Sequence, residues 1–391
     1  MLQELISHNS DLNQLWEEGY DLSIKDGHLL IQQVPYVNSQ KEIKYGSIVS
    51  TLNLSGNATL KPETHVVYFQ GEVPCKKSGQ PITGILNSSS KRVLTPSIHV
   101  DHLFSSKPAG GYPDYYVKIK TYVDIITSPA KSVDKNVTAQ NFKVSFDCED
   151  ESVFRYIDTN STRAGIRNVS DKVAGQKIGI IGLGGTGSYI LDLVSKNPVK
   201  EIHLFDSDYF LQHNAFRAPG AADIEDIKTR FRKVEYLEKI YSKIHKGIIT
   251  HCQNIDSGNA QSLKDFDFVF ICVDRGDVKR IIIDELIKNN IPFTDVGMGI
   301  QLVDNELIGT IRVTTATQGK NDHLSKRISF DNGQVDDYNA NIQIAELNAL
   351  NASLAVIRWK KHFRFYQDQE HEYNSSYSIN VNMLLSEDLE S

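Results

Sequence analysis

A glycine-rich turn behind a short apolar run is the feature that most limits how this chain of 391 residues folds. The apolar run is Lys177–Ile181, and the turn at 182–188 reads Gly-Leu-Gly-Gly-Thr-Gly-Ser. Glycine adopts positive φ, and its missing side chain lets phosphate groups approach the backbone amides that open the next helix. The pattern therefore predicts a strand, a phosphate-binding turn and a helix, which together begin a Rossmann-like α/β unit.

Beyond residue 170, short apolar segments alternate with longer amphipathic ones. This alternation is typical of a mostly parallel sheet with helices on both faces, because parallel strands need long crossover connections. An antiparallel strand at 309–314 and a strand at 378–384 in the polar tail are also expected. The main strands are expected at 178–181, 201–206, 246–252, 268–273 and 292–296, and the helices at 189–196, 234–245, 278–289 and 342–361.

The first 150 residues have a different character. They contain eight of the eleven prolines, which interrupt regular elements, and they read as short strands and turns. Strands are expected at 27–31 and 66–69, whereas 115–126 mixes helical and strand periodicity and fits either element. We therefore expect an α+β N-terminal domain at 1–150 and a second domain at 151–391.

Composition excludes several classes of protein. The formal net charge of −7 argues against a surface dedicated to nucleic acid. No run of 18 apolar residues occurs, and the first residues lack the basic and apolar regions of a secretion signal, so we expect neither a membrane span nor export. The four cysteines are Cys75, Cys148, Cys252 and Cys272, and they form no Cys-x-x-Cys pair. This pattern argues against a zinc site and against a disulfide framework. It predicts that the protein is located in a reducing cytoplasm.

Polar residues follow the expected strands at the ends where a parallel sheet binds ligands. Asp206 ends the second strand, where it can hydrogen-bond a ribose, and Asp274 follows the strand at 268–273, where a carboxylate can hold Mg²⁺ beside phosphates. Asn214, Arg217 and a lysine of the next helix can neutralise a triphosphate. A redox enzyme needs a single acid for the ribose, so the set favours ATP over a dinucleotide.

This combination resembles the ThiF/MoeB/HesA adenylyltransferases, which share a core with the ubiquitin-activating enzymes. The resemblance covers roughly residues 152–365 and implies an ATP-dependent adenylyltransferase. By this resemblance Asp206 binds the ribose, Asn214 and Arg217 contact the phosphates, and Asp274 supports the metal and catalysis. Asp208 has two open interpretations, a ligand contact or a residue that only orients the loop. The glycines implied to hold the nucleotide are Gly182, Gly184, Gly185 and Gly187.

Two family positions have more than one match in this chain. Lys233 fits best as the phosphate lysine, because it opens the next expected helix, and Lys228 is the alternative. Arg155 and Tyr156 resemble an arginine–tyrosine pair that family members carry before the glycine strand. In the family one arginine reaches into the ATP site of the partner subunit, so the resemblance implies a homodimer; Arg163 matches it after a small insertion, and Arg155 is the alternative.

The chain also departs from the family pattern. Ala218 replaces the usual glutamine after the arginine, and Arg275 replaces the usual asparagine after the catalytic aspartate. The paired zinc cysteines of many relatives are missing, so we expect no zinc. Enzymes that continue from an adenylate to a thioester need a thiol beyond that aspartate, and no cysteine follows Cys272. Cys75, in a basic and loop-like segment, is the thiol whose setting predicts a lowered pKa.

The segment 104–116 resembles part of a domain found before such cores in bacterial operons that encode ubiquitin-like conjugation proteins. The sequence therefore predicts activation of the C-terminal glycine carboxylate of a small ubiquitin-like protein, with a conjugating enzyme as a further partner. Two other hypotheses stay open. An NAD(P)-dependent oxidoreductase uses the same fold, and a non-catalytic nucleotide-binding scaffold fits the departures at Ala218 and Arg275.

Overall fold

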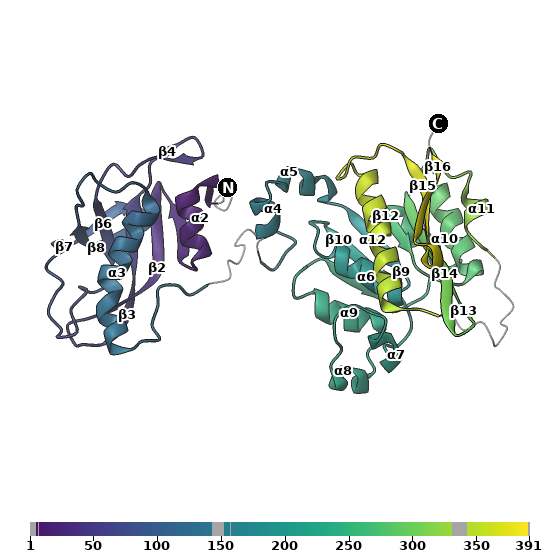
Figure 1. The fold of residues 1–391 in the computed structure, drawn as a ribbon, viewed down its shortest axis with the longest axis horizontal. Helices are drawn as coiled ribbons and strands as arrows, with labels where there is room; N and C mark the ends of the chain where they lie inside the picture. Colours follow the sequence, from purple (N-terminus) through teal and green to yellow (C-terminus); the bar gives the residue numbers. More distant parts are fainter. Residues whose placement is uncertain (1–4, 7, 143–151, 157, 331–341, 390–391) are drawn as a thin grey trace. The chain divides into compact units, whose positions relative to one another are not determined.

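The computed structural model describes residues 5–6, 8–142, 152–156, 158–330 and 342–389 (Figure 1). The chain forms two compact units. One consists of Met1–Ser145 with Thr162–Ala164, and the other of Phe146–Ser161 with Gly165–Ser391. Each unit has its own main sheet and its own hydrophobic core. Among the described residues, no helix is long and apolar enough to pass through a lipid bilayer.

The first unit is built on a six-stranded antiparallel sheet (Figure 1). Side chains alternate between its faces, so Leu29 and Ile31 join the main core while Leu30 joins a small cluster on the other face. The strand order is β1-β2-β3-β6-β8-β7. The strands are β1 (Asp21–Lys25), β2 (His28–Val37), β3 (Ile43–Thr51), β6 (Val66–Gln70), β7 (Leu86–Thr95) and β8 (Ile98–Ser105), and the short β4 (Leu54–Ser55) and β5 (Ala58–Thr59) pair with each other.

Two helices, α2 (Ser10–Glu17) and α3 (Tyr115–Val133), complete the core of this unit. The segment that fitted either element is helical because Asp114 caps it, with its side chain accepting the Val117 N–H at 2.8 Å. The buried side chains that follow have helical spacing and pack on the sheet. The expected α+β architecture of the N-terminal part is therefore confirmed. The buried residues of α3 in this core include Tyr115, Ile119, Tyr122 and Ile126.

The second unit contains an eight-stranded sheet in the order β11-β10-β9-β12-β13-β14-β15-β16. Its first five strands pair in parallel, and the last three continue the sheet in antiparallel fashion. The predicted mostly parallel sheet and the antiparallel strand after it are both confirmed. The strands are β9 (Lys177–Ile181), β10 (Glu201–Phe205), β11 (Ile248–His251), β12 (Phe268–Ile271), β13 (Phe293–Val303), β14 (Glu306–Ala316), β15 (Glu372–Ser378) and β16 (Met383–Leu389).

Helices cover both faces of this sheet, as expected. On one face α6, α9 and α12 share a core with the sheet, and on the other α10 and α11 share a second one. The helices are α4 (Thr159–Arg163), α5 (Arg167–Ser170), α6 (Gly185–Val194), α7 (Gln212–Ala215), α8 (Ile224–Thr229), α9 (Lys233–Tyr241), α10 (Gly276–Lys288), α11 (Leu324–Arg327) and α12 (Ala345–His362), with 3-10 turns at Asp171–Val173 (η1), Ala260–Asp265 (η2) and Ile379–Val381 (η3).

Two expected elements differ from the structure. The expected strand at 378–384 is wrong, because η3 separates the end of β15 from the start of β16 there. Asn382 takes φ +49°, a left-handed conformation that turns the chain between the two strands. The expected helix at 189–196 begins earlier, at Gly185, because the last part of the glycine turn is already its first turn. A glycine-rich helix start is hidden in a sequence because glycine has a low helix propensity.

Asp295 of β13 is a fully buried carboxylate held between two cations. Lys279 Nζ of α10 lies 2.8 Å from its Oδ1, and Arg312 Nη2 of β14 lies 2.6 Å from its Oδ2. Removing charges from water is costly, and removing one partner of such a cluster leaves the others uncompensated. The cluster therefore fixes α10 against β13 and β14.

We expect Asp295→Ala to lower the free energy of unfolding by about 3–5 kcal/mol, because the buried Lys279 and the half-buried Arg312 lose their counter-ion. The matched control is Asp277→Ala, which removes an exposed pair with Arg275 at 2.7 Å on the same helix and should cost about 0–1 kcal/mol. Urea unfolding followed by circular dichroism measures both values. Equal losses in the two variants would contradict the role assigned to Asp295.

His245 is a buried imidazole whose two nitrogens are both used. Nε2 lies 3.0 Å from the Val199 carbonyl oxygen and Nδ1 accepts the Gly247 N–H at 3.0 Å, which is the pattern of a neutral ring that donates from Nε2. Burial lowers the pKa of His245 from 6.5 to about 4. In the unfolded chain the ring is protonated below pH 6.5, so protonation favours unfolding.

The folded state should therefore lose stability as the pH falls from 6.5 towards 4, where the unfolded chain binds a proton that the folded chain excludes. The full contribution of His245 is present above pH 6.5 and amounts to about 3 kcal/mol relative to pH 4. Urea unfolding between pH 4.5 and 7.5 checks it, with a shallower pH dependence expected in His245→Gln. The exposed His213→Gln is the control, and a slope for His245→Gln as steep as that of the wild type would refute the assignment.

Candidate functional site

The glycine turn lies at the carboxyl end of β9, between β10 and β12 in the sheet. A Cβ on Gly182, whose φ is +89°, would lie 2.8 Å from the Cys272 carbonyl oxygen. A Cβ on Gly187 would lie 2.0 Å from the Gly182 carbonyl oxygen, and one on Gly185 would lie 2.0 Å from Asn348 Nδ2. Gly182 and Gly187 therefore require glycine for the packing of the turn itself, whereas at Gly185 the neighbour is the Asn348 side chain.

Gly184 differs from the other three glycines. The nearest atom to a Cβ on Gly184 would be Gln343 Oε1 at 3.9 Å, so one side of this residue is open. Gly184 immediately precedes α6 and, as a glycine, has no side chain of its own with which to cap that helix. The N–H groups of a first helical turn carry partial positive charge and bind anions. The open side of Gly184 is therefore where a phosphate can approach the turn.

Two side chains from the far end of the sequence hold this turn in place. The Gly185 N–H donates to Gln343 Oε1 at 3.3 Å, and Thr186 Oγ1 donates to Asn348 Oδ1 at 2.9 Å. Asn348 Nδ2 also donates to the Arg217 carbonyl oxygen at 3.3 Å. Sequence reasoning missed both residues. Asn348 had one available signal, a buried amide spaced three residues from Asn351 in a helix rich in alanine and leucine.

Asp206 joins the turn to the end of β10. It is 7% exposed, and its Oδ2 accepts the Leu183 N–H at 2.7 Å while its Oδ1 accepts the Asp208 N–H at 2.8 Å. Each carboxylate oxygen has a second lone pair, so these bonds leave acceptor capacity for a ligand hydroxyl. The position at the end of a strand beside the turn is the one predicted for a ribose contact.

Lys233 opens α9 and points at two carboxylates. Its Nζ lies 2.7 Å from Asp208 Oδ2 and 3.5 Å from Asp206 Oδ2, and the side chain is buried. An ammonium has three N–H donors, so one remains for a ligand. The alternative Lys228 lies on α8 with an exposed side chain and pairs with Glu225 at 2.7 Å. The structure therefore places Lys233, and not Lys228, beside Asp206.

Asn214 and Arg217 lie on and just after α7. Asn214 is buried and its Oδ1 accepts the Leu211 N–H at 2.8 Å, which leaves its amide N–H groups as donors. Arg217 Nε is buried and donates to none of the described residues. A buried donor without an acceptor is costly, and an anionic ligand can supply the acceptor. Both residues thus present donors, as expected for phosphate contacts.

Asp274 lies in the exposed segment between β12 and α10. Because β10, β9 and β12 are neighbours, the end of β12 is next to the glycine turn. Magnesium bound to a triphosphate needs only one or two carboxylates, since phosphate oxygens and water fill the other positions. The described residues contain no cluster of three or more metal-ligating side chains. Arg275 pairs with Asp277 at 2.7 Å.

Of the arginines expected before β9, Arg155 is not brought to this edge. Arg155 Nε donates to the Ser242 carbonyl oxygen at 3.1 Å, at the C-terminal end of α9, whereas Lys233 is at the other end of that helix. Tyr156 lines a cavity near Arg155. Arg163 ends α4, and its side chain lies outside the part of the chain that the structure describes.

The expectation of a lowered pKa for Cys75 is wrong. Cys75 is fully buried, its thiol donates to the Val73 carbonyl oxygen at 3.3 Å, and burial raises its pKa. Burial also raises the thiol pKa of Cys252 and of Cys272, while Cys148 lies outside the described residues. None of the three described thiols is activated as a thiolate. A basic sequence neighbourhood does not lower a pKa when the thiol is shielded from it.

Two family profiles match this chain. The ThiF family profile matches residues 160–357. A domain of unknown function, DUF6791, matches residues 10–159. No curated protein sequence is similar enough to match this chain.

Several solved structures have a similar fold. Selenomethionine PaaA is 17% identical, with 57% of this chain and 67% of that chain covered and a TM-score of 0.46. E. coli MccB with ATP is 17% identical, with 56% of this chain and 65% of that chain covered and a TM-score of 0.46. The microcin C7 biosynthetic enzyme MccB with N-formylated MccA is 15% identical, with 72% and 80% covered and a TM-score of 0.46. At these identities the likeness concerns the fold.

Substitutions at two glycines of the turn should separate effects on folding stability from effects on nucleotide binding. We expect Gly187→Ala to lower the free energy of unfolding by about 1–3 kcal/mol, because its methyl group collides with the Gly182 carbonyl oxygen. Gly184→Ala should change it by less than about 0.5 kcal/mol, yet weaken nucleotide binding at least tenfold. Urea unfolding and titration with a fluorescent ATP analogue measure the two effects. Unchanged affinity in a folded Gly184→Ala would mean that phosphate does not approach there.

Proposed function

The chain belongs to the ThiF family, and from this membership we propose that it is an ATP-dependent adenylyltransferase acting on the C-terminal carboxylate of a small ubiquitin-like protein. Family membership supports an enzyme of adenylyltransferase type. The observation that carries the proposal is the meeting of three strand ends. The glycine turn after β9, Asp206 after β10 and Asp274 after β12 lie on adjacent strands of one parallel sheet.

The proposed reaction transfers an adenylyl group. A carboxylate oxygen of the protein substrate attacks the α-phosphorus of ATP and forms a new P–O bond. The bond between the α-phosphorus and the bridging oxygen breaks, and pyrophosphate leaves with the electron pair. Such a reaction needs positioning and charge stabilisation more than proton transfer.

The residues divide this work between the two ends of the nucleotide. Asp206 accepts a hydrogen bond from the ribose, and the open first turn of α6 beside Gly184 receives phosphate oxygens. Lys233 and Arg217 stabilise the negative charge that develops on the phosphates, and Asn214 donates from its amide. Each of these side chains is partly or fully buried, so each acts in a setting where charges interact more strongly than in water.

Magnesium fits the site as a partner of the nucleotide. When bound with the nucleotide, Mg²⁺ would offset negative charge on the phosphates. Asp274 is the residue of this chain that we assign to hold it. Lys233 faces both Asp206 and Asp208, so these three groups sum to one negative charge. A second cation therefore complements the site when a triphosphate enters.

Two parts of the proposal concern a second copy of the chain. By the family resemblance, Arg163 of one subunit reaches the ATP site of the other in a homodimer.

The oxidoreductase hypothesis fits the site less well, because it gives no role to the buried, unpartnered Nε of Arg217. The exposed pair of Arg275 with Asp277 is the observation that favours a non-catalytic scaffold.

ATP–pyrophosphate exchange with a candidate ubiquitin-like protein tests the proposal. We expect exchange in the wild type, a loss of at least about 100-fold in Lys233→Met and in Asp274→Ala, and unchanged exchange in Lys228→Met. Lys228 is the matched control because it is an exposed lysine of the neighbouring helix.

Three outcomes would contradict the proposal. ATP–pyrophosphate exchange that survives in Asp274→Ala would contradict the assignment of Asp274 as the metal ligand. ATP binding without exchange favours the scaffold, and an NADH absorbance change with a reducible substrate favours the oxidoreductase.

A further inference from the structure

A cavity of about 370 Å³ lies within the second unit, away from the proposed nucleotide site. It is lined by Lys196 and Asn197, which follow α6, and by Lys360 near the end of α12. The glycine turn contacts the opposite ends of the same two helices, at Gly185 and Asn348. At 1.5 Å per residue, Asn348 and Lys360 are about 18 Å apart along α12. The cavity is therefore a separate site at the other edge of the sheet.

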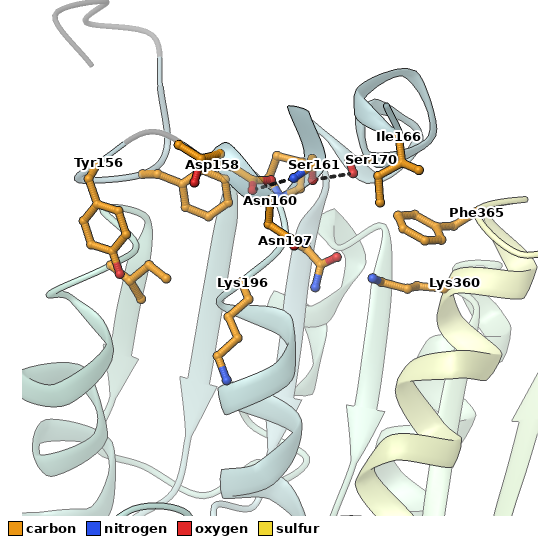
Figure 2. Close-up of a pocket in the computed structure, with 14 residues that line it drawn as sticks. Tyr156, Asp158, Asn160, Ser161, Ile166, Ser170, Lys196, Asn197, Lys360 and Phe365 are labelled. Atoms are coloured by element: carbon orange, nitrogen blue, oxygen red, sulfur yellow. Dashed lines mark hydrogen bonds between the residues drawn. The ribbon is translucent and has the colours of Figure 1, made fainter. Parts of the chain in front are cut away.

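Lys360 is a half-buried amine that points into this cavity (Figure 2). Its Nζ lies 3.9 Å from the centre of the Phe365 ring and 5.8 Å from that of Tyr366, and it has no acidic or hydrogen-bonding partner among the described residues. The adjacent Lys361 differs, because it pairs with Glu372 at 2.9 Å. The sequence thus provides a counter-ion on one side of α12 and none on the side of the cavity.

The rest of the lining is partly polar and partly apolar. Ser161 and Ser170 share a hydrogen bond of 3.1 Å at one wall, and Figure 2 shows Asn197 across from Lys360. Ile166 and Phe365 contribute apolar surface. A cavity of this size, with a few polar groups set in apolar walls, has the form of a small-molecule site.

The net charge of the lining limits what the cavity can hold. Two other charged side chains line it, and of these Lys196 is already paired with Asp192 at 2.7 Å. Asp158 adds one negative charge to the wall, which disfavours a dianionic phosphate. Lys360 is the described cation of the cavity that lacks a carboxylate partner. The group that complements Lys360 is therefore a single carboxylate attached to an apolar body, because a dianion would be repelled more strongly by Asp158.

We propose that this cavity binds a small organic monocarboxylate, with its carboxylate on Lys360 Nζ and its aromatic or aliphatic body against Ile166 and Phe365. A carboxylate accepts charge-assisted hydrogen bonds from an ammonium. The Ser161 and Ser170 hydroxyls are within the same wall and supply further donors. The site needs no nucleotide, so it stands whether or not the chain is an adenylyltransferase.

Proton linkage gives the proposal a specific signature. Burial lowers the pKa of Lys360 to about 8. Asp158 and Lys196 line the cavity with Lys360, and Tyr156 lines it as well. The elements around it also carry Asp192 on α6, Arg358, Lys361 and His362 on α12, and Lys172, Arg364 and Tyr366 nearby. A bound carboxylate favours the protonated amine, so at pH 8 binding should draw in about half a proton. At pH 6 the amine is already protonated, and the uptake should vanish.

Calorimetric titration of the full chain with benzoate tests the proposal. In buffers of different ionisation enthalpy we expect binding with an uptake of about half a proton at pH 8 and none at pH 6. Lys360→Met should weaken benzoate binding at least tenfold and abolish the uptake, whereas Lys360→Arg should retain most of the affinity. Lys196→Met is the matched control, because it removes a lysine of the same lining that is already paired with Asp192.

A second variant tests the volume independently of the charge. Ile166→Trp fills the cavity and should also weaken benzoate binding, while ATP binding stays unchanged because the nucleotide site lies at the other edge. Benzoate binding that is absent, that is equal in wild type and Lys360→Met, or that occurs without proton uptake at pH 8 would overturn the proposal. Benzyl alcohol, which keeps the ring and lacks the charge, should bind at least tenfold more weakly than benzoate.

Discussion

The contact between the glycine turn and the end of β12 is the constraint on which the rest of the site depends. Gly182 passes so close to the Cys272 carbonyl oxygen that a side chain has no room, and Gly187 packs equally closely on Gly182. This closeness brings the start of α6 beside both Asp206 and the segment that carries Asp274. A turn with larger residues would separate these strand ends, and the groups that they carry would no longer face one ligand.

Much of the fold could be predicted because its signals are local. Buried parallel strands read as apolar runs, so β9, β10 and β12 were predicted near their observed bounds. The strand at 378–384 was wrong because the left-handed Asn382 depends on one backbone angle that strand-forming neighbours conceal. The helix α6 begins inside the glycine turn, where propensity predicts none.

The site residues divide in the same way. Asp206, Asn214 and Arg217 stand at short, regular distances from the turn, and the sequence pattern placed them at one edge. Gln343 and Asn348 were missed because they reach the turn from about 160 residues away, a separation that no local pattern encodes. Cys75 was misjudged for a related reason. Its basic neighbours are visible in the sequence, whereas the burial that raises its pKa arises from the folded chain.

The buried charges of this unit explain how the exposed segment between β12 and α10, to which we assign the metal ligand, can still have a defined position. Asp274 is exposed, so its own packing does little to fix it. The helix that follows, α10, is held by Lys279 on Asp295, and Asp295 pairs in register with Ile271 at the end of β12. Desolvating these ions costs free energy, and their replacement by apolar residues often costs nothing in stability. The ions instead define the orientation of α10, because an ion pair with hydrogen bonds fixes the rotation of the helix more strictly than apolar packing does. The segment between β12 and α10 is thus anchored at both ends, although Asp274 itself is exposed to solvent.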